Sequence, residues 1–179
     1  MSLLIYGFGP YRQFKENITE KIIRSLPAKK GVKKVVFPVR FHKGQLIQAI
    51  QRYKPDVILG LGQCSRGRRL KIERRALNKR RESKGERPRP IAPGGPRSLA
   101  TSLSLNGAKQ ARVSYYAGDY VCNFSMYVIL DFLKHHRLPI PFGFIHIPQD
   151  YNIEKAKRYL LRVVDTVQGR QLGRKKAQT

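Results

Sequence analysis

The chain has 179 residues, 41% of them hydrophobic and 27% charged, and its 37 Lys and Arg against 11 Asp and Glu give a net charge of +26. This composition is typical of a globular domain with a buried core, and it excludes a disordered chain. Two cysteines are too few for a disulfide framework, and no apolar run approaches the ~20 residues of a membrane span.

The first third of the chain alternates between strand and helix patterns. A short apolar run predicts a buried strand over residues 3–6, and apolar residues at helical spacing predict a helix over 19–26. A second strand is predicted over 33–39 and a second helix over 45–53. Residues 56–61 are continuously apolar, which is typical of a central strand in a parallel sheet.

The rest of the chain repeats this alternation after a long basic loop that is rich in Pro and Gly, roughly 79–97. A strand is predicted over 112–116, a helix over 122–135, a strand over 141–147 and a last helix over about 153–168. Alternating strands and helices predict an α/β fold, a three-layer α/β/α sandwich with a mostly parallel twisted central sheet.

The positive charge is partly local. Residues 66–97 contain thirteen basic and three acidic residues, a net charge of +10, and residues 169–179 add four basic residues. We expect one domain over 1–168 and a basic, flexible tail over 169–179. The basic runs allow two interpretations, a solvated face or a surface that binds nucleic acid or another polyanion. No signal peptide is recognisable, so we expect a cytoplasmic protein with free thiols.

Functional residues of such folds gather where parallel strands end. Four segments occupy such positions in the predicted sheet, so we expect them to converge on one crevice. They are residues 7–14, 62–73, 118–122 and 146–148.

Three residues in or beside these segments are candidates for chemistry, and each has an ordinary alternative. Cys122 is predicted in the first turn of a helix, which favours a thiolate nucleophile, but free cysteines also pack as small hydrophobic residues. His146 lies at the end of a predicted apolar strand. It is either a general base or a core histidine that is hydrogen-bonded to a backbone carbonyl. Glu73 either orients that histidine or pairs with a neighbouring arginine.

Two other patterns predict no cofactor and no metal. Gly60-Leu61-Gly62 follows a strand, but the third glycine of a dinucleotide-binding loop is out of place. His135-His136 ends a helix and has no Cys or acidic residue at the spacing of metal ligands, so these histidines are expected to interact with the helix C-terminus.

Four motifs, in order, resemble those of the pyroglutamyl peptidase type I family of cysteine peptidases, also called pyrrolidone-carboxylate peptidases. The motifs are Gly7-Phe8-Gly9-Pro10-Tyr11 with Asn17, Gly62-Gln63 followed by Glu73-Arg74-Arg75-Ala76-Leu77-Asn78, Ala117-Gly118-Asp119-Tyr120-Val121-Cys122-Asn123, and Gly143-Phe144-Ile145-His146-Ile147-Pro148. The similarity runs from about residue 3 to residue 165.

The resemblance implies a Cys122, His146 and Glu73 triad and an enzyme that removes an N-terminal pyroglutamyl residue. Its partner would be a peptide with a blocked N-terminus. The resemblance also implies residues that bind the pyroglutamyl group, namely Phe8, Tyr11, Gln63, Tyr120 and Val121. It implies no cofactor. Because members of the family often form dimers or tetramers, it leaves a homo-oligomer open.

The chain departs from the family pattern around these motifs. Arg12 and Gln13 replace glycines, Ser65 and Arg66 replace glycines after Gln63, and a short basic loop replaces the family's longer loop over the substrate. These changes predict an altered specificity. The alternative function is a weak or inactive member of the fold that binds nucleic acid or another polyanion through residues 66–97 and the tail.

Overall fold

The structure is a computed structural model that describes residues 1–11, 15–105 and 109–176, with side chains as far as residue 169. The helices are α1 (Ile18–Ser25), α2 (Lys43–Tyr53), α3 (Val121–His135) and α4 (Ile153–Lys176). The strands are β1 (Leu3–Phe8), β2 (Val32–Phe37), β3 (Val57–Cys64), β4 (Leu70–Glu73), β5 (Arg75–Leu77), β6 (Ser98–Ala100), β7 (Ala111–Ser114) and β8 (Phe142–Pro148). Every predicted helix and strand is therefore present.

Six strands form the central sheet in the order β2-β1-β3-β8-β4-β7, and β5 and β6 form a separate antiparallel pair. All neighbours in the central sheet are parallel except β8 and β4. The α/β fold and the mostly parallel sheet are thus confirmed. The carboxyl ends of β1, β3 and β8 lie together at one edge, as parallel strands require.

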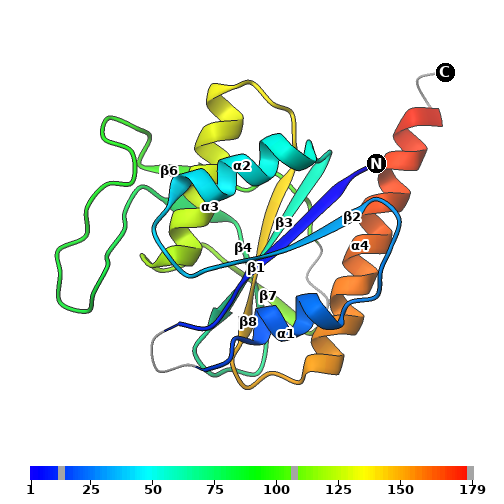
Figure 1. Ribbon diagram of the computed structural model, residues 1–179, viewed down its shortest axis with the longest axis horizontal. Helices are drawn as coiled ribbons and strands as arrows, with labels where there is room; N and C mark the ends of the chain where they lie inside the picture. The colour runs from blue at the N-terminus through cyan, green and yellow to red at the C-terminus, as the bar shows by residue number, and fades with distance from the viewer. Residues whose placement is uncertain (12–14, 106–108, 177–179) are drawn as a thin grey trace.

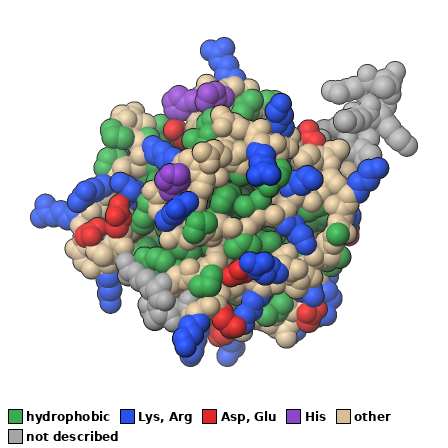
Figure 2. All heavy atoms as spheres, in the orientation of Figure 1, with side chains coloured by type: hydrophobic (Ala, Val, Ile, Leu, Met, Phe, Trp, Pro, Cys, Tyr) green, Lys and Arg blue, Asp and Glu red, His purple; other side chains and the backbone are tan. Residues whose placement is uncertain are grey.

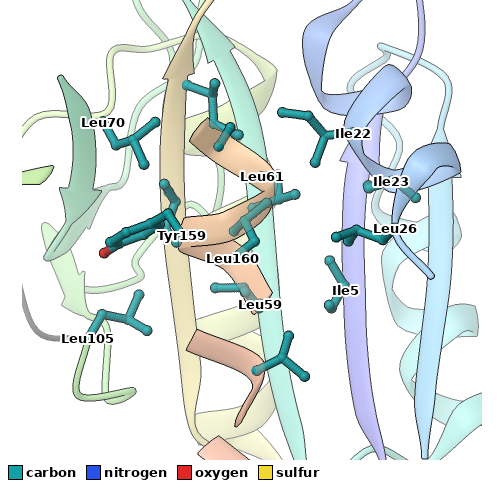
Figure 3. Close-up of a cluster of buried hydrophobic side chains, with 14 of the residues drawn as sticks. Ile5, Ile22, Ile23, Leu26, Leu59, Leu61, Leu70, Leu105, Tyr159 and Leu160 are labelled. Carbon is teal, nitrogen blue, oxygen red and sulfur yellow. The ribbon is translucent and has the colours of Figure 1, made fainter. Parts of the chain in front are cut away.

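Helices cover both faces of this sheet, with α1 and α4 on one side and α2 and α3 on the other (Figure 1). Side chains of β1, β3 and β8 alternate between the two faces, so each face has its own core. The α1/α4 core is built mainly from aliphatic side chains, among them Leu59, Leu61 and Leu160 (Figure 3). This arrangement buries both faces of the central strands and explains their continuous apolar sequences.

Two predictions about chain segments need correction. The strand predicted over 56–61 continues as β3 to Cys64, and the segment 62–73 contains a further strand, β4, with Glu73 at its end. The last helix does not end near 168: α4 continues to Lys176, so most of the predicted tail is helical. Glycines at 169 and 173 disfavour a helix, but the Arg, Gln, Leu and Lys residues around them favour one.

The basic segment between β5 and β6 projects from the fold as green loops (Figure 1). Several of its cations have partners within the protein: Arg80 lies over the Phe41 ring and pairs with Glu82, and Lys79 lies over the Tyr116 ring. Elsewhere, Lys and Arg side chains are spread over most of the face seen in Figure 2 rather than gathered in one patch. None of the helices in the described ranges is long and apolar enough to cross a bilayer.

Candidate active site

His146 and Glu73 meet inside the sheet. They lie on the neighbouring antiparallel strands β8 and β4, where Glu73 is paired in register with Phe144. His146 Nδ1 is 2.8 Å from Glu73 Oε1, and the two side chains are buried, with 7% and 0% exposed. The neighbouring Arg74 instead donates to the carbonyl oxygens of Leu103 and Leu105. Glu73 is therefore bonded to the histidine and not to an adjacent arginine.

Cys122 lies in the first turn of α3, one residue after the helix begins. The backbone N–H groups in the first turn of any helix have no helical acceptor, and Tyr120 supplies no side-chain cap for them, so this end of α3 favours an anion. The sulfur lies directly over β3: a Cβ atom on Gly62 would be 2.7 Å from Cys122 Sγ. A glycine at position 62 is thus required for the sulfur to approach the sheet.

The His146 imidazole is influenced by Glu73 on one side and by the Cys122 sulfur on the other. Burial by itself would lower the pKa of His146, but the charge and hydrogen bond of the Cys122 sulfur, followed by the hydrogen bond and charge of Glu73, raise it to about 9. The ring also packs edge-on against Phe144 at 5.1 Å between centroids, which limits its rotation. An imidazolium between a carboxylate and a sulfur can stabilise a thiolate.

Buried hydrogen bonds fix the start of α3 relative to the strands. Ser125 Oγ donates to the Cys122 carbonyl at 2.8 Å and lies 3.1 Å from the Tyr6 hydroxyl of β1. Asn123 accepts from the Leu77 N–H and donates to the Leu77 and Lys79 carbonyls, each at 2.8 Å. The position of Cys122 is therefore set by β1 on one side and by the basic segment on the other.

The basic segment is also tied to the loop that precedes Cys122. Arg81 forms an ion pair with the buried Asp119 carboxylate, and the Arg81 backbone N–H donates to the Asp119 carbonyl at 2.8 Å. Asn78 fixes the same segment internally, because it bonds Ile91, Ala92 and Gly95. These contacts give part of the positive charge a structural role beside the site.

A cavity of about 180 Å³ opens beside the Cys122 sulfur. It is lined by all five residues that the resemblance predicts to bind the pyroglutamyl group. The lining residues are Phe8, Tyr11, Asn17, Val39, Gln63, Tyr120, Val121 and Cys122. Its walls are mostly apolar, with a few polar groups, as suits a small neutral ring.

The polar groups of this cavity have partners that orient them. Gln63 Oε1 accepts a hydrogen bond from the Ile18 N–H at 2.9 Å, which turns the amide oxygen away and leaves the amide nitrogen as a donor. Asn17 caps α1 by accepting from the Thr19 N–H at 3.0 Å. Two lining residues, Asn17 and Val39, were not predicted to bind substrate. Asn17 was named as part of the first motif without a binding role, and no feature of the sequence distinguished Val39.

The remaining predicted features lie apart from this site or outside the described residues. The His135 ring nitrogen Nδ1 lies 2.8 Å from the Asp131 carbonyl oxygen near the end of α3. Arg12 and Gln13, which replace family glycines, are outside the described residues. A larger cavity of about 700 Å³ shares Gln63 with the first one but contains none of the three triad candidates.

Comparison with known proteins agrees with the fold and the motifs. The family model for pyroglutamyl peptidase matches residues 1–158. The chain is 32% identical to pyrrolidone-carboxylate peptidase 1 of Saccharolobus solfataricus, over 83% of this chain and 79% of that one. It is 31% identical to pyrrolidone-carboxylate peptidase of Oceanobacillus iheyensis, over 84% and 85% of the two chains.

Solved structures agree as well. A mutant pyrrolidone carboxyl peptidase from Pyrococcus furiosus superposes with a TM-score of 0.80 and 25% identity, covering 92% of this chain and 97% of that chain. Pyrrolidone carboxyl peptidase from Thermococcus litoralis gives a TM-score of 0.73 and 27% identity, over 82% and 76%. On the family match, the sequence identities and the shared fold, this chain belongs to the pyroglutamyl peptidase family of cysteine peptidases.

Proposed function

We propose that this protein removes an N-terminal pyroglutamyl residue from peptides, with Cys122 as nucleophile, His146 as acid and base, and Glu73 as the group that orients His146. The observation that best supports this proposal is the buried hydrogen bond between Glu73 and His146, beside a half-buried Cys122 whose sulfur raises the pKa of the imidazole. A nucleophile, a base and an orienting carboxylate in this order are the arrangement that acyl transfer needs.

The first half of the proposed reaction forms an acyl-enzyme. The pyroglutamyl ring occupies the cavity lined by Phe8, Tyr11, Gln63, Tyr120 and Val121. The Cys122 thiolate attacks the carbonyl carbon, and the resulting oxyanion accepts a hydrogen bond from the Cys122 backbone N–H at the start of α3. The C–N bond then breaks as the His146 imidazolium gives its proton to the departing amine.

The second half releases the acyl group. A water molecule gives a proton to the neutral His146 imidazole and attacks the thioester carbonyl. The C–S bond breaks, pyroglutamate leaves, and the thiolate and imidazolium are restored. Glu73 remains an anion throughout and keeps the Nδ1 side of the ring oriented.

Hydrolysis of a fluorogenic pyroglutamyl arylamide tests this proposal. We expect turnover by the wild type and a loss of at least ~10⁴-fold in kcat for Cys122→Ala, because no other group replaces a covalent nucleophile. Cys64→Ala is the matched control, because it removes the other thiol, whose pKa is raised by burial. Equal rates for the wild type and Cys122→Ala would exclude Cys122 from the mechanism.

The alternative function, binding of nucleic acid or another polyanion, stays a prediction. The relatives found here are named as peptidases. Part of the basic segment is engaged within the protein through Arg80 and Arg81. A homo-oligomer and a cytoplasmic location also remain predictions.

A further inference from the structure

A row of side chains crosses four strands on the sheet face that carries Cys122. The register pairs Gly62 of β3 with His146 of β8, His146 with Lys71 of β4, and Lys71 with Arg112 of β7. Residues directly opposite one another on adjacent strands point to the same face, and neighbouring strands lie about 4.8 Å apart. Because the Cys122 sulfur lies over Gly62, the row runs from the sulfur through the imidazole to two cations.

The direction of this row matches the direction in which a substrate would extend. The apolar cavity lies on the β1 side of Cys122, with Phe8 in its wall. A substrate with its ring in that cavity and its carbonyl at the sulfur presents the departing nitrogen to His146, on the β8 side. The chain after the scissile bond then continues toward β4 and β7.

The spacing matches residues close to the scissile bond. An extended peptide advances about 3.3 Å per residue. Lys71 is one strand beyond His146, about 5 Å away, and therefore reaches the first or second residue after the bond. Arg112 is two strands beyond, about 10 Å away, and reaches the third.

Both cations are available to a ligand. Arg112 is exposed and Lys71 is half-buried. Within the described ranges, neither forms an ion pair with an acidic side chain. Their charges act on the Cys64 thiol, two residues after Gly62 on the same face, which agrees with their placement beside the site.

The larger cavity that shares Gln63 is a weaker candidate for the same substrate residues. Its cations, Lys15, Lys21 and Arg66, lie together with the acids Glu16 and Asp150. Lys21 is already paired with Glu16. This cavity therefore offers a mixed surface, whereas Lys71 and Arg112 form no ion pair with an acidic side chain in the part of the chain that the structure describes.

We propose that Lys71 and Arg112 bind the part of the substrate that follows the pyroglutamyl group, and that they give the enzyme a preference for acidic side chains there. This inference rests on the function proposed above. An exposed ion pair contributes up to about 1 kcal/mol, which corresponds to about fivefold in kcat/KM for each cation.

The test compares two peptides of equal length, pyroglutamyl-Glu-Glu-Glu-amide and pyroglutamyl-Gln-Gln-Gln-amide, with a pyroglutamyl arylamide as a third substrate. We expect the wild type to favour the Glu peptide by up to about fivefold in kcat/KM for each cation at low salt, and by less at high salt. Lys71→Gln and Arg112→Gln should each reduce this ratio toward one. Arg66→Gln, which removes a cation of the other cavity, should retain the wild-type ratio.

A charge reversal adds a gain of function. Arg112→Glu should favour pyroglutamyl-Gln-Gln-Lys-amide over pyroglutamyl-Gln-Gln-Glu-amide, a result that an unfolded variant cannot produce. Equal kcat/KM for the Glu and Gln peptides, with the arylamide still hydrolysed, would overturn this inference alone. An equal loss of preference in Arg66→Gln and Arg112→Gln would overturn the assignment to Lys71 and Arg112. No turnover of any substrate by the wild type would overturn the proposed function, and this inference with it.

Discussion

The two faces of the central sheet are packed by different kinds of side chain. The α1/α4 face is filled mainly by aliphatic residues such as Ile22, Leu59, Leu61 and Leu160 (Figure 3). The α2/α3 face contains several aromatic rings and also buried polar residues. These polar residues include Glu73, Asn123, Ser125 and His146, with the Tyr6 hydroxyl beside Ser125.

This difference between the two faces suggests that one mainly stabilises the fold and the other mainly positions the candidate catalytic side chains. A buried aliphatic side chain stabilises the fold through removal of apolar surface from water and is tolerant of small shifts. A buried polar group destabilises the fold unless it is hydrogen-bonded, and each bond restricts its geometry. On the α2/α3 face those bonds fix Cys122 and His146, while Glu73 Oε2 still accepts no hydrogen bond from the described residues. One face therefore stabilises the sheet, and the other uses it as a support for chemistry.

The substitution Glu73→Gln tests most directly whether the polar groups of the α2/α3 face serve catalysis rather than stability. We expect a loss of about 10³-fold in kcat, because a neutral amide cannot stabilise the imidazolium and can donate to Nδ1, which selects the wrong tautomer. The shape of the side chain is retained, so the midpoint of urea unfolding should change little compared with the activity. Hydrolysis of the pyroglutamyl arylamide and urea unfolding, measured on the same preparation, check both expectations.

Glu20→Gln is the matched control for this substitution. Glu20 is an acid of α1 that pairs with Arg24 on the surface, and its loss should change neither quantity appreciably. If Glu73→Gln retained wild-type kcat, Glu73 would have no orienting role, and the polar groups of the α2/α3 face would be structural only.

The converse substitution, Leu160→Ala, tests the other face. Leu160 is fully buried on α4, and its truncation should lower the free energy of unfolding by about 3 kcal/mol, a factor of about 10² in the folding equilibrium. The folded fraction should retain its kcat at low temperature, because α4 supplies none of the three proposed catalytic residues. Leu138→Ala is the control, since Leu138 is 37% exposed and its truncation should have a much smaller effect on stability. A large loss of kcat in folded Leu160→Ala would show that the faces are coupled.

The sequence predicted the α1/α4 face and the long elements of the other face well, for a physical reason. Central parallel strands and amphipathic helices carry their burial in their own spacing, as in β3 and α1. The ends of these elements were less well predicted. At the end of α4, glycines at 169 and 173 were outweighed by the helix formers around them.

Most of what was missed lies near Glu73. β4 and β5 are short strands inside a run of basic residues, so neither shows a clear alternation of apolar and polar positions. The antiparallel pairing of β4 with β8, which brings Glu73 to His146, involves residues 73 positions apart in the chain. Local periodicity contains no information about such a contact. The candidate triad was therefore named from motifs, while the strand that carries its acid was not foreseen.

The last and smallest expected effect concerns titration, which also differs between the faces. Burial raises the pKa of Tyr159 on the α1/α4 face, so that phenol stays neutral through the neutral range. On the other face the pKa of His146 is raised to about 9, above its ordinary value of 6.5, so the imidazolium contributes fully below pH 6.5 and its contribution is lost as the pH rises through about 9. In the proposed mechanism the departing amine takes its proton from that imidazolium, so kcat/KM should fall about tenfold per pH unit above 9. Glu73→Gln should move this fall in kcat/KM to lower pH, because it removes one of the groups that raise the pKa of His146. A fall centred near pH 6.5 in the wild type would mean that His146 is not coupled to Cys122 and Glu73 in the working enzyme.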